Sequence, residues 1–341
     1  MLDNKVVLIT GGAGSVGQSL VRRFLETDLD VLRVFDNNEP SLSALGKSLD
    51  DERCRFLAGD IRDQERLVRA MQGVDIVVHT AAMKHVDICE YNPFEAVKTN
   101  AVGLQNVVDT AINSGVDRVV FTSSDKAVNP ANTMGTTKLL GEKLITAGNK
   151  HAGRSDLRLA SVRFGNVINS SQSVIPLFAK QIRDGGPVTL TDTRMRRFFL
   201  TDEDVFDLVT SAIEQTKGGE VFIHKMPTIR IEDLAEAMIY ELAPEFGHNP
   251  KDVDIEIIGR RVGETFHEEI ITEREATRTV ESETLYAVLP ENGEDAHLNH
   301  PGMDGFDTAD DIDLSTQVAD PLSVDEVKAL LRENNILENA L

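Results

Sequence analysis

The feature that most constrains the fold is a regular alternation of short apolar runs with stretches of helical spacing through the first half of the chain. β-branched and other apolar residues fill six runs, which we expect to be strands, at 5–10, 30–35, 53–58, 75–80, 116–122 and 157–164. The clearest helical stretches between them are 15–27, 92–114 and 133–149. Strands separated by helices form right-handed βαβ units, and uniformly apolar strands are typical of a sheet covered on both faces. The sequence therefore predicts an α/β domain with a parallel sheet.

After about residue 165 the pattern becomes irregular. Helical spacing recurs at 174–184, 202–215, 231–242 and 324–333, with short strands expected at 187–190, 220–223 and 254–257. The segment 290–320 is acidic and rich in Gly, Pro and Asn, which predicts a loop or flap. We therefore expect a first domain at 1–165, with parts of 190–230 returning to it, and a smaller α+β lobe with a C-terminal flap at 166–341.

Composition excludes several classes of protein. The 341 residues carry a formal net charge of -22, whereas a nucleic-acid-binding protein needs a basic face. No apolar run approaches the roughly 20 residues that span a bilayer, and the first residues do not resemble a signal peptide. Two cysteines, Cys54 and Cys89, are too few for a disulfide framework or a cysteine metal cluster. We expect a soluble, cytoplasmic protein without a metal, nucleic-acid partner or membrane insertion.

A glycine-rich turn follows the first predicted strand and opens the first predicted helix. Gly11 permits the tight turn, Gly14 lets the backbone approach a pyrophosphate, and Gly17 allows close packing of helix on strand. Ser15 and Val16 begin the helix, whose N-terminus attracts a phosphate. In this strand–turn–helix setting the pattern predicts a dinucleotide site, and a plain tight turn is the weaker interpretation.

Asp36 ends the second predicted strand, where a carboxylate accepts hydrogen bonds from the adenosine ribose and repels a 2′-phosphate. No Arg or Lys occurs at 37–46 to receive such a phosphate. The sequence therefore predicts NAD rather than NADP. Further cofactor contacts are expected after the third and fourth strands, at Asp60, Ile61, Ala81 and Ala82.

The fifth predicted strand delivers a polar cluster, Thr122, Ser124, Asp125 and Lys126, to the carboxyl edge of the sheet, where such folds bind ligands. An adjacent carboxylic acid and amine suit the elimination of water. One group removes a proton next to a carbonyl, and the other protonates the departing hydroxyl. The alternative, a solvated ion pair, would be preferred on an ordinary loop but is disfavoured at this edge.

The next helix places Met134 and Lys138 one turn apart, on one face. The segment is similar to the active site of a short-chain dehydrogenase, with Met134 at the position of the catalytic Tyr. A thioether cannot take up a proton, so either catalysis is lost or acid–base work falls on Asp125 and Lys126. Lys138 would hold the nicotinamide ribose and lower nearby pKa values by its charge. Without a ligand, Met134 would be core filler and Lys138 a surface cation.

Nine segments together carry a family resemblance, at 10–17, 79–86, 90–100, 124–130, 134–138, 163–167, 173–178, 194–198 and 263–268. They resemble the UDP-N-acetylglucosamine 4,6-dehydratases of the extended short-chain dehydrogenase/reductase superfamily, in a branch with Met at the Tyr position. The resemblance covers about residues 3–335. It implies a Rossmann-type doubly wound parallel sheet and a homo-oligomer.

The activity that the resemblance implies is a closed redox cycle. NAD takes a hydride from C4 of the sugar, and the resulting ketone acidifies the proton on C5. Lys126 removes that proton, Asp125 helps the C6 hydroxyl leave as water, and the hydride returns to C6. Asp125, helped by Thr122 or Ser124, is the candidate base for the C4 hydroxyl. The residues implied to contact the UDP-sugar are Lys84, His85, Asn166, Arg197, Arg261 and Glu264.

Two other functions stay open on the same scaffold. One is a nucleotide-sugar 4-epimerase, which has no use for the Asp125–Lys126 pair and usually needs the Tyr. The other is a non-catalytic NAD-binding sensor or scaffold, which the missing Tyr alone supports. One motif also departs from the family pattern Arg-Pro-Gly-Glu-Lys, because this chain has Thr265 at the Lys position.

Overall fold

The computed structural model describes residues 2–153, 155–168, 170, 173–260, 263–291, 303–309, 312–334 and 336–337. The chain divides into two compact units, each assembled from three separate segments. Unit 1 comprises Met1–Phe164, Asp202–Lys225 and Ile271–Ile312. Unit 2 comprises Gly165–Thr201, Met226–Ile270 and Asp313–Leu341.

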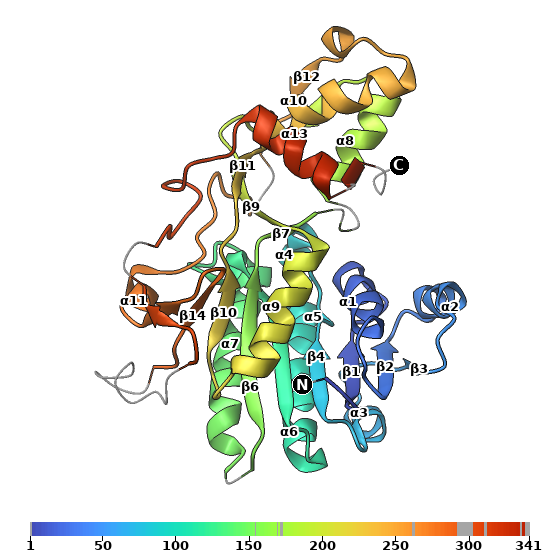
Figure 1. The fold of residues 1–341 in the computed structure, drawn as a ribbon, viewed down its shortest axis with the longest axis vertical. Helices are drawn as coiled ribbons and strands as arrows, with labels where there is room; N and C mark the ends of the chain where they lie inside the picture. The colour runs from blue at the N-terminus through green and yellow to red at the C-terminus, as the bar shows by residue number, and fades with distance from the viewer. Residues whose placement is uncertain are drawn as a thin grey trace. The chain divides into compact units, whose positions relative to one another are not determined.

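Unit 1 is built on a ten-stranded sheet in the order β15-β13-β14-β10-β6-β5-β4-β1-β2-β3 (Figure 1). Its strands are β1 (Val6–Thr10), β2 (Val31–Asp36), β3 (Cys54–Ala58), β4 (Ile76–His79), β5 (Arg118–Ser124), β6 (Arg158–Phe164), β10 (Val221–His224), β13 (Thr279–Glu281), β14 (Leu285–Val288) and β15 (Asp307–Thr308). The seven strands from β3 to β10 pair in parallel, and β14, β13 and β15 add antiparallel strands at one edge. The predicted Rossmann-type parallel sheet is confirmed.

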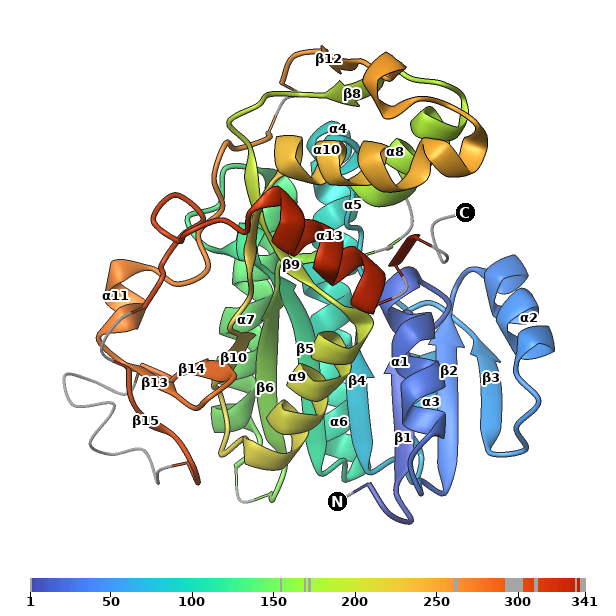
Figure 2. The ribbon, with the colours of Figure 1, turned by 45° about the horizontal axis from the view of Figure 1, so that its top comes forward.

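Helices cover both faces of this sheet (Figure 2). They are α1 (Ser15–Leu25), α2 (Glu39–Ser48), α3 (Gln64–Met71), α4 (Val86–Tyr91), α5 (Pro93–Val97), α6 (Leu104–Ser114), α7 (Thr133–His151), α9 (Asp202–Gln215) and α11 (Glu273–Ala276), with a π-helical turn η1 (Lys98–Gly103) and a 3₁₀ turn η2 (Asp125–Ala127). On one face α1 packs beside α9, and on the other α6 packs beside α7. The β1 residues Val7, Leu8 and Ile9 are fully buried, as a strand between two helical layers requires.

Unit 2 has small sheets and its own apolar core. Its elements are β7 (Asn166–Val167), α8 (Val174–Arg183), β8 (Val188–Leu190), β9 (Arg196–Leu200), β11 (Thr228–Arg230), α10 (Ile231–Leu242), η3 (Pro244–Phe246), η4 (Pro250–Asp252), β12 (Ile255–Ile257) and α13 (Val324–Glu333). β11, β9 and β7 form one sheet, and β12 pairs with β8. Ile182, Met238 and Val327, from α8, α10 and α13, are fully buried in the core that joins these three helices.

The structure differs from the expected organisation in three places. Residues 271–312 were expected in the second lobe but belong to unit 1, because β13 and β14 extend its sheet past β10. The helix expected at 92–114 is divided into α5, the π-helical η1 and α6. The predicted acidic flap falls largely outside the described residues; within its described part, Asp307–Thr308 forms β15. Among the described helices, none has the length and apolarity of a membrane span.

Candidate functional site

The glycine turn between β1 and α1 is shaped by backbone contacts. Gly11 has a φ of +70°, and a Cβ there would lie 2.5 Å from the Ala81 nitrogen. A Cβ on Gly17 would lie 2.2 Å from the carbonyl oxygen of Gly11, so only glycine lets α1 begin this close to the turn. Gly14 is exposed and is followed by Ser15, where α1 begins. This turn therefore leaves the N-terminus of α1 open beside exposed backbone, which fits a dinucleotide pyrophosphate.

Asp36 lies at the end of β2 and is fixed by the turn itself. Its Oδ2 accepts a hydrogen bond from the Ala13 nitrogen at 3.0 Å, and its Oδ1 accepts one from the Asn38 nitrogen at 2.8 Å. Each carboxylate oxygen has a further lone pair for a ribose hydroxyl. The carboxylate is thus held at the glycine turn. Asp36 is the residue that the sequence predicts to favour NAD over NADP.

The further cofactor contacts predicted after the third and fourth strands have structural partners of their own. Asp60 pairs with Arg62, whose hydrogen bonds lower the pKa of the Asp60 carboxyl. The Ile61 side chain is buried in the core of unit 1. Thr80, which precedes Ala81 and Ala82, donates a hydrogen bond to the Thr10 carbonyl at 2.8 Å. Of these residues, Thr80 and Ala81 lie against the glycine turn at Gly11.

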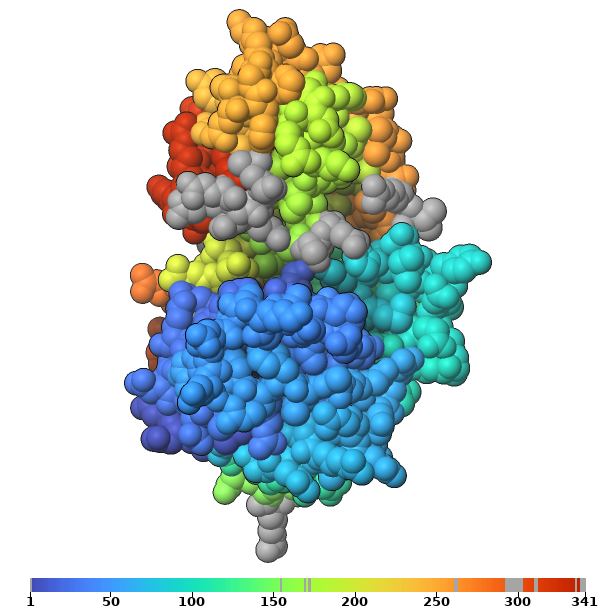
Figure 3. Space-filling model, turned by 90° about the vertical axis from the view of Figure 1, so that its right-hand side faces the viewer, coloured from blue at the N-terminus to red at the C-terminus, as the bar shows by residue number. Residues whose placement is uncertain are grey.

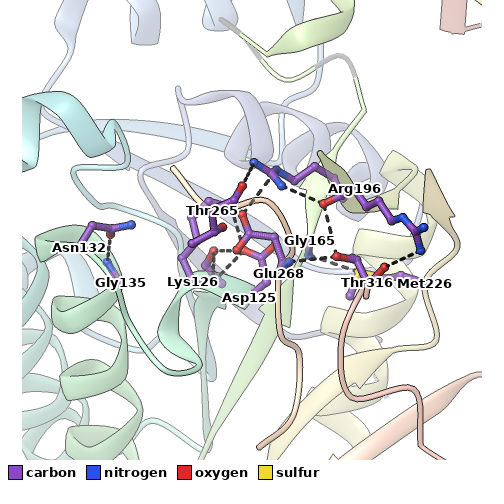
Figure 4. Close-up of polar contacts among 12 residues, drawn as sticks. Asp125, Lys126, Asn132, Gly135, Gly165, Arg196, Met226, Thr265, Glu268 and Thr316 are labelled. Carbon is purple, nitrogen blue, oxygen red and sulfur yellow. Dashed lines mark hydrogen bonds and ion pairs between the residues drawn. The ribbon is translucent and has the colours of Figure 1, made fainter. Parts of the chain in front are cut away.

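Asp125 and Lys126 lie in η2, directly after β5. Asp125 Oδ1 accepts hydrogen bonds from Ser124 Oγ at 2.8 Å, from the Lys126 nitrogen at 2.8 Å and from Lys126 Nζ at 3.0 Å (Figure 4). Asp125 Oδ2 is buried without a hydrogen-bond partner among the described residues. The Asp125 side chain is 0% exposed and that of Lys126 is 25% exposed. The carboxyl therefore has one saturated oxygen and one that is available, beside a partly open amine.

The neighbouring hydroxyls differ in what they can do. Ser124 donates to Asp125, so it belongs to the same cluster. Thr122 instead donates to the His79 carbonyl at 3.1 Å, within the sheet. In this arrangement Ser124, and not Thr122, is in contact with the Asp125 carboxyl that it was expected to assist.

The start of α7 is fixed against η2. The Asn132 side chain caps the helix by accepting a hydrogen bond from the Gly135 nitrogen at 2.8 Å (Figure 4). A Cβ on Gly135 would lie 2.0 Å from the Lys126 carbonyl oxygen, so glycine is needed for this close approach. From α4, Glu90 accepts a hydrogen bond from the Thr133 nitrogen. The backbone that carries Lys126 and the first turn of α7 are therefore packed as one block.

Met134 and Lys138 both lie on the buried side of α7. Met134 packs with Cys89 and Ala96, so its thioether is part of a small apolar cluster. Lys138 Nζ donates to the Thr122 carbonyl at 2.7 Å and lies 4.8 Å from the centroid of the Phe121 ring. Burial lowers the pKa of Lys138 to about 8. The expected alternative of a surface cation does not apply to this amine.

His79, at the end of β4, was not singled out from the sequence. Its Nδ1 shares a hydrogen bond of 2.7 Å with Thr10 Oγ1, and its Nε2 is buried without a partner among the described residues. Burial, with a smaller contribution from the Lys138 charge, lowers the pKa of His79 to about 3. The imidazole is therefore neutral at physiological pH.

Lys84 and His85 lie in the loop between β4 and α4, and this loop is pinned by Asn100 of η1. Asn100 Oδ1 accepts a hydrogen bond from the Met83 nitrogen at 2.8 Å, and its Nδ2 donates to the Met83 carbonyl at 3.0 Å. The same Nδ2 donates to Thr137 on α7 at 2.9 Å. The loop that carries the predicted sugar contacts is thus tied to α7.

The other predicted substrate residues fall in unit 2. Asn166 begins β7, Glu264 lies in a loop, and Arg261 is outside the described residues. Arg197 is buried, and its guanidinium donates to the carbonyls of Arg196, Thr265 and Phe266 and pairs with Glu268 at 3.5 Å. Arg197 therefore braces the loop of unit 2 in this structure.

Sequence reasoning missed two cationic features. In unit 2, Arg194 and Arg260 lie 4.1 Å and 4.8 Å from the centroid of the Phe266 ring, and Arg194 is largely exposed. In unit 1, the buried Arg163 pairs with Glu142 and Glu275. Within the described residues, no cluster of His, Cys, Asp and Glu could hold a metal ion.

Comparison with known proteins gives consistent matches. The family model for "Polysaccharide biosynthesis protein" matches residues 7–290. A relative from Campylobacter jejuni subsp. jejuni serotype O:2, named UDP-N-acetylglucosamine 4,6-dehydratase (inverting), is 42% identical over 292 residues, or 85% of this chain and 84% of the relative.

Two solved structures extend the similarity to the fold. The X-ray structure of Pen from Bacillus thuringiensis is 39% identical with a TM-score of 0.90, covering 98% of this chain and 99% of that one. DesIV from Streptomyces venezuelae, a dTDP-glucose 4,6-dehydratase with NAD and TYD bound, is 26% identical with a TM-score of 0.67, covering 76% and 86%. With its glycine turn and polar strand edge in place, this chain belongs to the polysaccharide biosynthesis protein family, within the extended short-chain dehydrogenase/reductase superfamily.

Proposed function

We propose that this protein is an NAD-dependent nucleotide-sugar 4,6-dehydratase that converts UDP-N-acetylglucosamine to UDP-2-acetamido-2,6-dideoxy-4-hexulose, for surface polysaccharide or protein glycosylation. The observation that carries the proposal is the buried Asp125 carboxyl, 3.0 Å from the Lys126 amine at the carboxyl end of β5. The named activity of the Campylobacter jejuni relative supports the choice of reaction and substrate.

The pair can hold one proton in two ways. As an ion pair, the proton is on Lys126. If it moves to Asp125, the amine becomes a base and the carboxyl an acid, with no change in total charge. Because Oδ1 already accepts three hydrogen bonds, the unpartnered Oδ2 is the oxygen that carries the proton to a leaving hydroxyl. Lys126 Nζ then takes the proton from C5 of the sugar, and water is lost across C5 and C6.

The glycine turn would hold the cofactor. NAD bound there supplies a reversible hydride acceptor, so oxidation at C4 and reduction at C6 balance with no net redox change. Asp36 orients the adenosine ribose, and the N-terminus of α1 faces the pyrophosphate. Lys138 holds the nicotinamide ribose from its position beside Thr122. The NAD in the DesIV structure supports this assignment.

Unit 2 would supply the nucleotide-sugar site, as the second domain was expected to do. Asn166, Arg261 and Glu264 remain the proposed substrate contacts of unit 2, and Lys84 and His85 remain those of unit 1. The internal contacts of Arg197 favour a bracing role for it, so the exposed Arg194 is the better candidate to meet a diphosphate.

We also place the protein in the cytoplasm, as a homo-oligomer. Ile88, Tyr91, Phe94 and Val102, from α4, α5 and η1, are exposed apolar residues. Figure 3 shows this stretch of the chain, in cyan, on the molecular surface. Exposed large apolar residues are typical of an interface, and a second copy of the chain would bury these four.

Incubation with UDP-N-acetylglucosamine and NAD tests the proposed activity. The expected product has lost the mass of one water molecule, and NADH does not accumulate. A stereoisomer of unchanged mass would make the protein an epimerase. Bound NAD without any change in the sugar would make it a sensor or scaffold.

A further inference from the structure

A buried ionic cluster lies behind the catalytic edge of unit 1. Arg163 on β6 donates from Nε and Nη2 to the two carboxylate oxygens of Glu142 on α7, at 2.9 and 2.8 Å. It donates from Nη1 and Nη2 to the two oxygens of Glu275 on α11, at 3.0 and 2.6 Å. Ser123 Oγ, at the end of β5, donates to Glu142 at 2.6 Å. The cluster therefore ties four elements of unit 1 together, β5, β6, α7 and α11, in a region without bulk water.

The charges in this cluster do not cancel on the Glu142 side. Arg163 has one positive charge and faces two carboxylates. Glu275 also interacts electrostatically with Arg278, and it belongs to a capping box with Thr272. Although burial opposes ionisation, the carboxylates raise the pKa of the Arg163 guanidinium, and the contacts with Arg163 hold the pKa of Glu275 at about 2. Arg163 and Glu275 are therefore both charged at physiological pH.

Glu142 follows Lys138 by four residues on α7, so the two side chains lie on the same face one turn apart. Both are buried. A buried amine loses its proton easily, because burial disfavours the charged form. For Lys138 the desolvation is opposed by the Glu142 charge. The ring of Phe121, 4.8 Å from Nζ, also favours the charged amine.

Other titratable groups face Lys138 or pack around α7. The Cys89 thiol from α4 and the His79 imidazole from β4 interact electrostatically with Lys138. Burial raises the pKa of the Cys89 thiol and lowers that of His79, so both are neutral at physiological pH. Asp125 and Lys126 of η2 form their own pair, and Lys98 of η1 pairs with Glu95. Glu142 is thus the carboxylate on the same helix face that acts on the amine.

We propose that the Ser123–Glu142–Arg163–Glu275 cluster is a buried counter-charge that keeps Lys138 protonated, with Glu142 as a positioning residue that acts through Lys138. The cluster supplies the charge at the cofactor edge without touching cofactor or substrate. A protonated Lys138 can donate to ribose hydroxyls. In a chain with Met134 in place of the phenol, this is the role left for the amine. Only the measurement of NAD binding depends on the proposed function. The titration of Lys138 does not depend on it.

The direct test is the titration midpoint of Lys138, followed by NMR in protein made with isotope-labelled lysine. The Lys138 resonance is identified by its absence from Lys138→Arg. In the wild type the midpoint is expected at about 8. In Glu142→Gln it should fall by about one pH unit, because a neighbouring opposite charge has been removed.

Glu275→Gln is the matched control, since it also removes one carboxylate from Arg163 but leaves Glu142 in place. It should leave the Lys138 midpoint within a few tenths of a pH unit of the wild type. Equal displacements in both variants, or none in Glu142→Gln, would overturn the proposal. If Glu142→Gln does not fold, Glu142→Asp and Glu275→Asp replace the pair. Only the first should lower the midpoint, and by less than the Gln variant would.

The second readout is the dissociation constant of NAD as a function of pH, measured by calorimetry. The affinity for NAD should weaken as pH rises through the Lys138 midpoint. In Glu142→Gln this fall in affinity should occur at lower pH, displaced by as much as the Lys138 midpoint is displaced. If the wild type does not bind NAD, the proposed function is contradicted. The NMR titration of Lys138 would still test the effect of Glu142 on the amine. An affinity limb that stays in place while the Lys138 midpoint moves would refute the role of the cluster in cofactor binding.

Discussion

Two buried polar groups, Asp125 in unit 1 and Arg197 in unit 2, are used in opposite ways. At the carboxyl edge of unit 1, Asp125 keeps one carboxylate oxygen without a partner among the described residues, beside an amine that is partly exposed. In unit 2, the guanidinium of Arg197 is used by the carbonyls and carboxylate of its own loop. Buried polar groups are normally satisfied, so an unpartnered one at a sheet edge indicates a site prepared for a ligand. A fully satisfied one indicates a structural brace.

The largest expected effect tests the unit 1 side of this comparison. Lys126→Ala should lower turnover by about 10²–10⁴-fold, the range of a lost general acid or base. NAD affinity should be unchanged, because the glycine turn is untouched. Steady-state rates and calorimetry measure the two. Lys143→Ala, at an exposed position on α7, is the control. Near-normal turnover in Lys126→Ala would contradict the assigned chemistry.

Gly17→Ala tests the close packing of the glycine turn, because it adds one methyl group and no polar atom. The added Cβ would lie 2.2 Å from the Gly11 carbonyl oxygen, a backbone atom that cannot move aside easily. We expect a loss of about 3 kcal/mol in the free energy of unfolding, at the upper end for overpacking, with weaker NAD binding. Gly14→Ala has 3.2 Å at the same oxygen and should cost much less. Urea titrations of both variants measure the difference, and equal losses would contradict the packing argument.

Arg197→Met and Arg194→Met test the two different roles assigned to arginines of unit 2, a brace and a ligand contact. Arg197→Met leaves buried carbonyls and Glu268 without their donor, and should lower the free energy of unfolding by about 1–3 kcal/mol. Arg194→Met, at an exposed position, should leave stability within error and raise KM for the UDP-sugar. Urea unfolding and steady-state kinetics measure the pair. The reverse result, with stability kept and KM raised in Arg197→Met, would make Arg197 the ligand contact.

At neutral pH the smallest effect is expected from His79, whose contribution to stability changes only in acid. Its folded-state pKa of about 3 is below the ordinary value of 6.5, so the unfolded chain binds more protons between these two pH values. Its contribution to stability is complete above about 6.5 and is lost as pH falls toward 3, by at most about 1.4 kcal/mol per pH unit. His79→Gln should have a shallower acid limb in urea titrations, whereas exposed His151→Gln should match the wild type. An identical limb in His79→Gln would exclude this role.

Most of the unit 1 fold could be predicted from the sequence, because apolar strands and glycine spacing are local signals. The run ending at Thr10 and the glycines after it were enough to place the turn. β13 and β14 escaped prediction, since they are short and lie at an antiparallel edge, where the apolar pattern is weak. The division of the 92–114 helix was also missed. Its π-helical turn carries Asn100, whose partner Met83 is 17 residues away.

In the candidate site too, contacts between neighbours in sequence could be predicted and contacts between distant segments could not. Asp125 and Lys126 are neighbours in sequence, and their juxtaposition could be read directly. Arg163 and Glu275 are 112 residues apart, and nothing local in either segment indicates that they meet. Arg197 was predicted as a contact of the UDP-sugar, but the direction of its side chain depends on where the loop at 265–268 passes. Contacts made by tertiary folding are therefore the part that sequence patterns leave open.

The discontinuous assembly of unit 1 also has a consequence for synthesis on the ribosome. β10 is paired on its outer side by β14, so the nascent chain carries an unfinished sheet margin until residues 285–288 have left the exit tunnel. An unpaired strand margin is a template for self-association. Biogenesis of this protein therefore includes an interval of exposure that ends only when the last third of the polypeptide has been translated.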